Sequence, residues 1–190
     1  AIEIKLVEKN GEALGPTTRP FVKYPTVSYQ THVQNIGWQN DVRNGESSGT
    51  TGRALRLEGI KIQLTDLPYA GSISYSTHIQ NIGWQNDVND GLLSGTSGQG
   101  LRLEAIKIKL DGEMAQNFDI YYRVHAQIFG WTGWAKNGEP AGTAEYGYRL
   151  EAIQIKMIPK GSVAPGKTTG AFMENPKVVL NVPFVSQLTP

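Results

Sequence analysis

The sequence predicts an all-β protein made of three homologous repeats around a pseudo-threefold axis, in a β-prism-like arrangement. Three observations lead to this fold class. One string of residues recurs three times, each copy opens with alternating apolar and polar residues, and no stretch shows a sustained helical period. A linear β-solenoid is the second choice, whereas a propeller needs about four or more blades.

The repeat is defined by residues that keep their offsets from copy to copy. Its tryptophans, Trp38, Trp84 and Trp131, stand 46 and 47 residues apart. A histidine, an arginine and a glutamate recur with the same spacing. The predicted organisation is an opening strand with a connector (1–26), three repeats (27–64, 73–110 and 120–158), a linker rich in Gly, Pro, Ser and Thr (159–176), and a C-terminal segment (177–190).

The first residues resemble the end of a repeat. Ala1 to Leu6 spells AIEIKL, close to the AIKIKL of Ala105 to Leu110. Two interpretations stand. The strand is the remainder of a truncated upstream repeat, or it completes the sheet of the third repeat and ties the chain ends together.

Each repeat begins with a strand of period two. In the first copy the more apolar face holds Val27, Tyr29, Thr31 and Val33, and the residues between them are polar, so one face is expected to be wet. In the closing strand of each repeat the apolar parity changes halfway. The change falls at the small residues Gly59, Ala105 and Ala152, which predicts a β-bulge that lets both halves face the core.

Composition excludes several classes of function. The 190 residues carry a formal net charge of +1, which gives no electrostatic basis for nucleic-acid binding. The absence of cysteine excludes thiol nucleophiles and thiolate metal sites. No run of eighteen apolar residues is present, so membrane insertion is not expected.

The tryptophans are the first candidates for ligand binding. Trp38, Trp84 and Trp131 each follow a turn glycine, and Trp134 is an extra tryptophan of the third copy. An exposed indole offers an apolar face to a sugar ring while its polar neighbours bind hydroxyls. A single repeated tryptophan is also often architectural, so a core position and an exposed position both remain open.

Polar residues on the wet strand face complete the candidate site. A histidine and a glutamine two residues later recur in each copy, and with the asparagine that follows in two copies they are expected to form a hydrogen-bonding groove. The alternative for the histidines is a structural hydrogen bond, and no metal site is predicted from them. The members are His32, His78, His125, Gln34, Gln80 and Gln127.

The recurring arginine and glutamate lie two residues apart on a strand and therefore share a face. They are Arg56 and Glu58, Arg102 and Glu104, and Arg149 and Glu151. A structural ion network is the prediction. Equivalent glutamates do not provide the two different carboxyl groups of a glycosidase, and no nucleophile, metallopeptidase or phosphate-loop motif is present. Neither an enzyme nor a cofactor is predicted.

The ordered string H-x-Q-x-x-G-W, then N/D-G, then G-T, then R-L-E-A-I-K-I resembles the clostridial hydrophobic-with-tryptophan repeat, or ChW repeat. The resemblance covers Val27 to Ile158. It implies a secreted or surface protein of a Gram-positive bacterium that binds polysaccharide or mediates surface contacts. Many family members read GWxxW. The third copy fits with Trp131 and Trp134, but Asp41 and Asp87 replace the second tryptophan in the other copies, so equal binding by all three is not expected.

The tail KVVLNVPFVSQLTP, Lys177 to Pro190, is similar to the opening of papain-like cysteine peptidase domains. The similarity is short, and no cysteine follows within the chain. A terminal strand that packs on the repeats is the alternative.

These observations predict a non-catalytic extracellular module that binds cell-wall or other polysaccharide, such as peptidoglycan, and anchors an attached secreted protein. The alternative is a protein-interaction or assembly module on the cell surface, and a pure spacer is a third idea. Weak sites in three copies would add by avidity.

Overall fold

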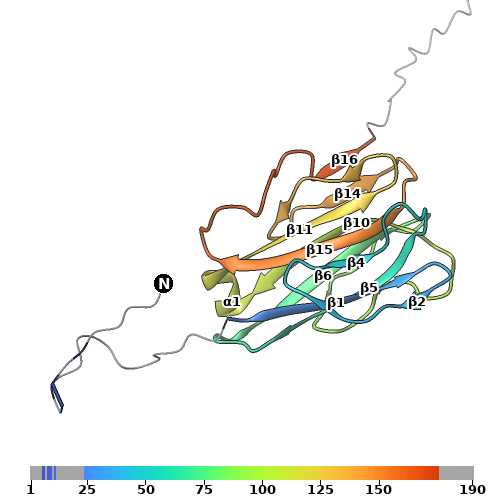
Figure 1. The fold of residues 1–190 in the computed structure, drawn as a ribbon. Coiled ribbons are helices and arrows are strands. Elements are labelled where there is room, and N and C mark those ends of the chain that lie inside the picture. The colour runs from blue at the N-terminus through green and yellow to red at the C-terminus, as the bar shows by residue number, and fades with distance from the viewer. Residues whose placement is uncertain (1–5, 7, 10, 12–23, 176–190) are drawn as a thin grey trace, which may run out of the picture.

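The computed structural model describes residues 6, 8, 9, 11 and 24–175. The predictions for Ala1 to Leu6 as a strand and for Lys177 to Pro190 fall on residues outside this description, apart from Leu6. Figure 1 shows the described part as long neighbouring strands with short strands at their margins. Within it, no helix has the length and hydropathy needed to cross a bilayer.

Each repeat forms a long antiparallel strand pair at the centre of its own sheet. The pairs are β1 (Thr26–Val33) with β5 (Leu57–Thr65), β6 (Gly71–Ile79) with β10 (Leu103–Asp111), and β11 (Phe118–Ala126) with β15 (Leu150–Pro159). The predicted apolar face of the first strand is buried in the first repeat, where Val27, Tyr29, Thr31 and Val33 are all buried. The predicted wet face is only partly wet, because residues such as Ser28, Ser74 and Asp119 on it are buried as well. The predicted all-β class with three repeats is confirmed.

Two short strands of each repeat flank its first long strand. They contain the Gly-Trp turn and the segment that follows it. They are β2 (Gly37–Trp38) and β3 (Val42–Arg43), β7 (Gly83–Trp84) and β8 (Val88–Asn89), and β12 (Gly130–Trp131) and β13 (Ala135–Lys136).

A third short strand crosses to the neighbouring repeat. Strand β9 (Ser94–Gly95) of the second repeat pairs with β5 of the first, and β14 (Ala141–Ala144) of the third pairs with β10 of the second. Strand β4 (Ser47–Gly49) of the first repeat closes the cycle on β15 of the third. The three sheets are thus joined in a ring, as the predicted pseudo-threefold arrangement requires, while the β-prism-like description stays an interpretation.

The bulge predicted from the change of parity is present in the closing strand of each repeat. His32 pairs with Gly59 and Val33 with Leu57, which leaves Glu58 without an opposite residue. The extra residue lets Leu57, Ile60 and Ile62 all point into the core, where each is almost fully buried. The same shift occurs at the corresponding positions of the other two sheets.

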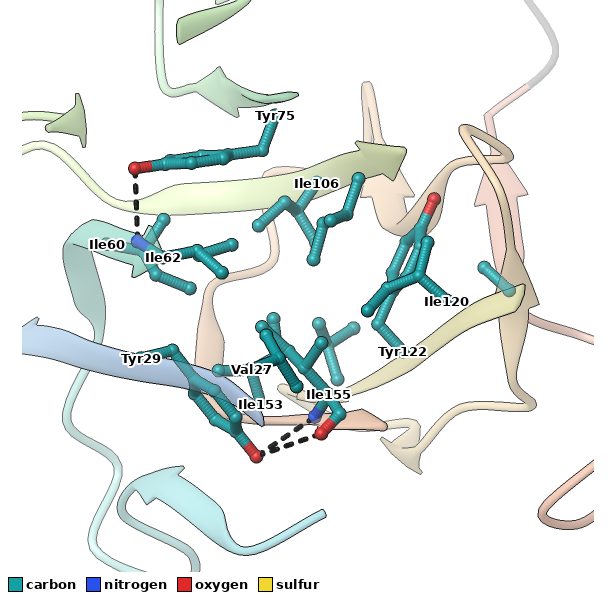
Figure 2. Close-up of a cluster of buried hydrophobic side chains, with 14 of the residues drawn as sticks. Val27, Tyr29, Ile60, Ile62, Tyr75, Ile106, Ile120, Tyr122, Ile153 and Ile155 are labelled. Carbon is teal, nitrogen blue, oxygen red and sulfur yellow. Dashed lines mark hydrogen bonds between the residues drawn. The ribbon is translucent and has the colours of Figure 1, made fainter. Parts of the chain in front are cut away.

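The core lies where the three strand pairs meet, and all three repeats contribute to it. Equivalent isoleucines Ile60, Ile106 and Ile153 belong to one buried cluster (Figure 2). Because each repeat contributes only one apolar face, none can cover its own residues without the other two.

Buried tyrosines tie the repeats to one another by hydrogen bonds. The Tyr29 hydroxyl donates to the Glu46 carbonyl of its own repeat and accepts from the Ile155 N–H of the third, at 3.0 Å (Figure 2). The Tyr75 hydroxyl likewise accepts from the Ile62 N–H of the first repeat at 3.0 Å. Each tyrosine therefore satisfies a backbone group next to a strand crossing.

Two features differ from the simple three-copy pattern. A six-residue helix, α1 (Gly112–Asn117), joins the second repeat to the third, too short to leave a helical period in the sequence. The end of the predicted linker 159–176 packs on the third repeat, where β16 (Phe172–Glu174) adds to β14 as a parallel strand. The composition of this segment suggested a linker because Gly and Pro disfavour regular structure. Its backbone nevertheless forms hydrogen bonds at the sheet edge.

Candidate functional site

The repeated tryptophan lies next to the repeated histidine across two paired strands. In the first repeat His32 of β1 is opposite Trp38 of β2, and their ring centroids are 5.5 Å apart in an edge-on geometry. His78 with Trp84 and His125 with Trp131 repeat this arrangement at 5.5 and 5.6 Å. All three tryptophans are half-buried. They lie on the sheet surface, neither fully buried in the core nor fully exposed, which were the two alternatives that the sequence left open.

A buried glutamate carboxylate lies next to each repeated histidine. Glu58, on the bulge, is only 3 % exposed. One of its oxygens accepts from Arg56 Nε and Nη2 at 2.9 and 2.8 Å, and the other lies 3.2 Å from His32 Nδ1. The pairing of arginine and glutamate predicted from their shared face is confirmed. The arginine and the glutamate neutralise each other within the fold, which favours a structural role for the pair.

The contact between histidine and glutamate is close but poorly aligned. The Nδ1 atoms of His32, His78 and His125 are buried and make no well-directed hydrogen bond, although a glutamate oxygen lies 3.1 to 3.2 Å away in each repeat. The Arg-Glu-His-Trp row is therefore built alike in all three copies.

A cation lies over each indole, a feature that the sequence analysis did not single out. Lys61 Nζ is 4.8 Å from the ring centre of Trp38, and Lys107 Nζ is 4.2 Å from that of Trp84. In the third repeat the guanidinium of Arg123 is 4.9 Å from the ring centre of Trp131. A lysine on the solvent side of a strand has no distinctive sequence signal, so only the three-dimensional placement identifies it.

Trp134, the extra tryptophan, has a different environment. It is only 6 % exposed, and the chain after the third repeat covers it. Its backbone N–H donates to the Lys167 carbonyl at 2.8 Å, and the N–H of Gly133 donates to the Gly170 carbonyl. The exposed alternative considered for Trp134 is therefore not what the structure shows.

The predicted glutamines are held by their backbones. The N–H groups of Gln34, Gln80 and Gln127 donate to the carbonyls of Arg56, Arg102 and Arg149 at 2.9 to 3.0 Å. Their side chains are half-buried beside the histidines. Asn35 and Asn81, which follow two of them, adopt positive φ and are exposed. None of the three glutamines lines a pocket described below, whereas His78 and Asn81 line one together, so the predicted His-Gln-Asn groove stays a prediction.

Shallow pockets adjoin two of the tryptophans. One of about 310 Å³ is lined by Trp84 and Lys107 together with Ser76 and the ion pair of Lys109 with Asp87. A second, of about 370 Å³, adjoins the third repeat. Its lining includes Trp131, Arg123, Phe129, Lys167 and Thr169. Residues of the chain that follows the third repeat, Lys167 to Met173, form one wall of this second pocket.

Another pocket, of about 430 Å³, lies between the second and third repeats. It is lined by His78, Arg102 and Glu104 of the second repeat and by Glu145 and Gly147 of the third. Each Arg-Glu-His row thus lies near a repeat boundary. Over the described part of the chain, no group of three His, Cys, Asp or Glu side chains is placed to hold a metal ion.

The site combines indole surface, cations and hydroxyl or amide groups in open hollows. Such a combination is suited to holding a polar ligand with an apolar face. The pocket between the second and third repeats holds two carboxyl groups, those of Glu104 and Glu145, and Glu104 is paired with Arg102 at 2.8 Å.

Comparison with known proteins identifies the repeats. The family model described as "Clostridial hydrophobic W" matches residues 32–66, 78–112 and 125–159, which is more than half of the chain. This family is a repeat module, consistent with binding, and is not known as a catalytic one. No curated protein and no solved structure matches the chain. The chain therefore belongs to the Clostridial hydrophobic W (ChW) repeat family, with three tandem copies.

Proposed function

We propose that this chain is a non-catalytic module that binds peptidoglycan or another polysaccharide through Trp38, Trp84 and Trp131. It would hold an attached secreted protein at the surface of a Gram-positive bacterium. The observation that carries the proposal is the triplicate half-buried indole beside a histidine, with an open hollow next to two of the three indoles, those of Trp84 and Trp131. A sugar ring has an apolar C–H face for such an indole and hydroxyls for its polar surroundings.

Three similar sites on one rigid body favour a polymeric ligand. A single stacking contact is weak, but a second contact on the same polymer forms at high effective concentration. The strand exchange fixes the spacing of the sites, because each sheet shares a strand with the next. A repeating polysaccharide can therefore engage more than one site at once.

A pull-down on insoluble peptidoglycan and on insoluble neutral polysaccharides tests the proposal. We expect the wild-type chain to be retained by at least one of them. Trp84→Ala should weaken retention, and the triple variant of Trp38, Trp84 and Trp131 to Ala should abolish it. Tyr24→Ala, which truncates an aromatic residue that is 67 % exposed elsewhere on the surface, is the matched control and should bind normally.

Circular dichroism of each variant separates loss of the site from loss of the fold. Failure of the wild-type chain to bind any glycan would reject the proposal. Normal retention of a folded triple variant would show that the tryptophans are not the site.

A protein-interaction module is the second candidate, and the turn tips favour it. Apolar residues beside each tryptophan are exposed, among them Ile36, Ile82 and Ile128, of which Ile128 is 74 % exposed. Apolar tips repeated around a ring could pack on another protein. Concentration-dependent oligomers in light scattering, without glycan binding, would support this alternative.

A further inference from the structure

We infer that the tryptophan sites select acidic polysaccharides, in which a carboxylate or phosphate pairs with the cation over the indole and the sugar contacts the ring. This inference rests on the proposed function and names the ligand class of the same sites. The supporting observation is that every repeat has a cation over its tryptophan, although the residue that supplies this cation differs between the repeats.

The cation comes from one member of a cross-strand pair, and the member differs between repeats. The aligned pairs are Gln30 with Lys61, Ser76 with Lys107, and Arg123 with Gln154. In two repeats the second long strand supplies a lysine, and in the third repeat the first long strand supplies an arginine.

When the second long strand lacks the cationic residue, the first long strand supplies one instead. This indicates that the repeats retain a positive charge over the indole and not a lysine at a fixed strand position. Where Lys61 and Lys107 would recur, the third repeat has Gln154, whose Oε1 accepts from Arg123 Nε at 2.8 Å. The guanidinium nevertheless lies 4.9 Å from the ring centre of Trp131, close to the 4.8 Å of Lys61 at Trp38, and it lies at the same distance from the ring centre of the buried Trp134. A solvent-facing lysine with no role could be lost without a replacement on the opposite strand.

The position of the cation also discriminates between ligands. A cation over an indole at an accessible site is held only weakly. A neutral sugar that stacks on the same ring has to displace the cation and gains no ionic contact. An acidic sugar can instead pair its anionic group with the cation while its ring meets the indole.

Local charge favours an anion most strongly at the third repeat. The lining of the pocket at Trp131 includes Arg123 and Lys167 and no carboxylate. At Trp84, Lys107 and Lys109 outnumber Asp87, which is already paired with Lys109 at 3.0 Å. At Trp38, Lys61 is the cation over the ring, and Gln63 occupies the position that Lys109 has at the Trp84 site. We therefore expect the affinity for acidic sugars to decrease from the third repeat to the second to the first.

Binding of soluble polymers by the full chain tests the inference. The probes are polygalacturonate, its fully methyl-esterified form, and purified wall teichoic acid, which carries phosphate. We expect the chain to bind at least one anionic polymer and the esterified one much more weakly. Preference for one anionic polymer identifies carboxylate or phosphate as the group recognised. Added salt should weaken binding to the anionic polymers.

The decisive variants remove the cationic residue from one position of the Arg123–Gln154 pair and then place one at the other position. Arg123→Gln should reduce affinity for the bound anionic polymer by roughly tenfold, the scale of one lost charge-assisted contact. The double variant Arg123→Gln with Gln154→Lys rebuilds the arrangement of Gln30 and Lys61 and should restore most of that affinity. Arg43→Gln, which removes an exposed charge elsewhere, is the charge-matched control and should have little effect.

The outcomes separate the two proposals. Equal binding of the charged and esterified polymers, an unchanged Arg123→Gln variant, or failure of the double variant to recover would overturn the preference for acidic ligands. Retention on neutral glycans with no binding of anionic ones would do the same while leaving the proposed function intact. Binding to no glycan at all would end both.

Discussion

Single glycines determine where one repeat can cross another. Gly95 of β9 has a φ of +102°, and a Cβ placed there would lie 2.5 Å from the Glu58 carbonyl oxygen of the first repeat. Gly49 and Gly142 occupy the equivalent crossings, with equally close backbone neighbours. The Gly-Thr step recurs in the repeat because a side chain would separate the strands that join the ring.

Gly95→Ala is therefore expected to lower the free energy of unfolding by about 3 kcal/mol, from the strained φ together with the clash. Gly98→Ala is the matched control in the same loop. Gly98 also has a positive φ, of +69°, but no atom lies within 4 Å of the position that a Cβ would occupy there, so the loss should be about 1 kcal/mol. Urea unfolding measures both. Equal losses would show that the crossing is not tightly packed.

At the scale of elements, a polar pair links the first strand of a repeat to its crossing strand. Thr77 of β6 and Ser94 of β9 are both buried, and their hydroxyl oxygens are 2.9 Å apart. Thr31 and Ser48 make the same contact at 2.8 Å. In the third repeat the aligned residues are Val124 and Ala141, both buried. The two positions have thus changed together from a hydrogen-bonded pair to an apolar pair.

This exchange predicts strong coupling in a double-mutant cycle. Thr77→Val alone leaves the buried Ser94 hydroxyl without its partner and should cost about 1–3 kcal/mol of unfolding free energy. Thr77→Val with Ser94→Ala installs the residue pair of the third repeat at these two positions, and Gln85 Oε1 keeps its hydrogen bond from the Gly95 N–H, so the double variant should lie within about 1 kcal/mol of wild type. Thermal or urea unfolding of the four proteins gives the coupling. A double variant that loses the sum of the two single losses would contradict this account.

The strands and the bulge could be predicted from the sequence because parity reports directly which face is buried. The change of parity at Gly59 required an extra residue, and Glu58 is that residue. The crossing of β9 to another repeat could not be predicted, since a short Ser-Gly-Thr segment carries no signal for its partner. Lys61 and Arg123 were missed for a similar reason. Their role depends on a ring that only the folded strands bring near.

Burial of Trp134 illustrates the same limit. Its pattern matched a family motif, but what covers it is a Gly- and Thr-rich segment of the type that usually forms linkers. That segment docks by backbone hydrogen bonds, such as the one from the Trp134 N–H to the Lys167 carbonyl. Backbone bonding of this kind leaves no residue pattern to detect.

For the whole molecule, the repeats depend on one another through shared strands, core and tyrosines. Burial, opposed in part by hydrogen bonds from backbone N–H groups, raises the pKa of Tyr29 and Tyr75 to about 12. Burial also raises the pKa of Tyr122. The three hydroxyls occupy equivalent positions at the repeat boundaries, so their ionisation would act on the whole ring.

Alkaline pH should therefore destabilise the fold. An unfolded phenol ionises near pH 10, whereas the folded tyrosines stay protonated until about pH 12, so the folded state binds more protons in between. The stability that these groups contribute is complete below pH 10 and is lost as pH rises toward 12. Melting temperatures across this range should fall steeply, and Tyr75→Phe should flatten the decrease. A melting temperature independent of pH would exclude this linkage.

The binding role proposed for this molecule depends on three equivalent indoles, and NMR can observe each of them separately. Trp38, Trp84, Trp131 and Trp134 each give one indole N–H signal, to be assigned by single Trp→Phe variants. On titration with the polysaccharide that retains the chain, we predict that the signals of Trp38, Trp84 and Trp131 shift or broaden, while that of the covered Trp134 changes least. Saturating binding that leaves all three signals unchanged would contradict the account.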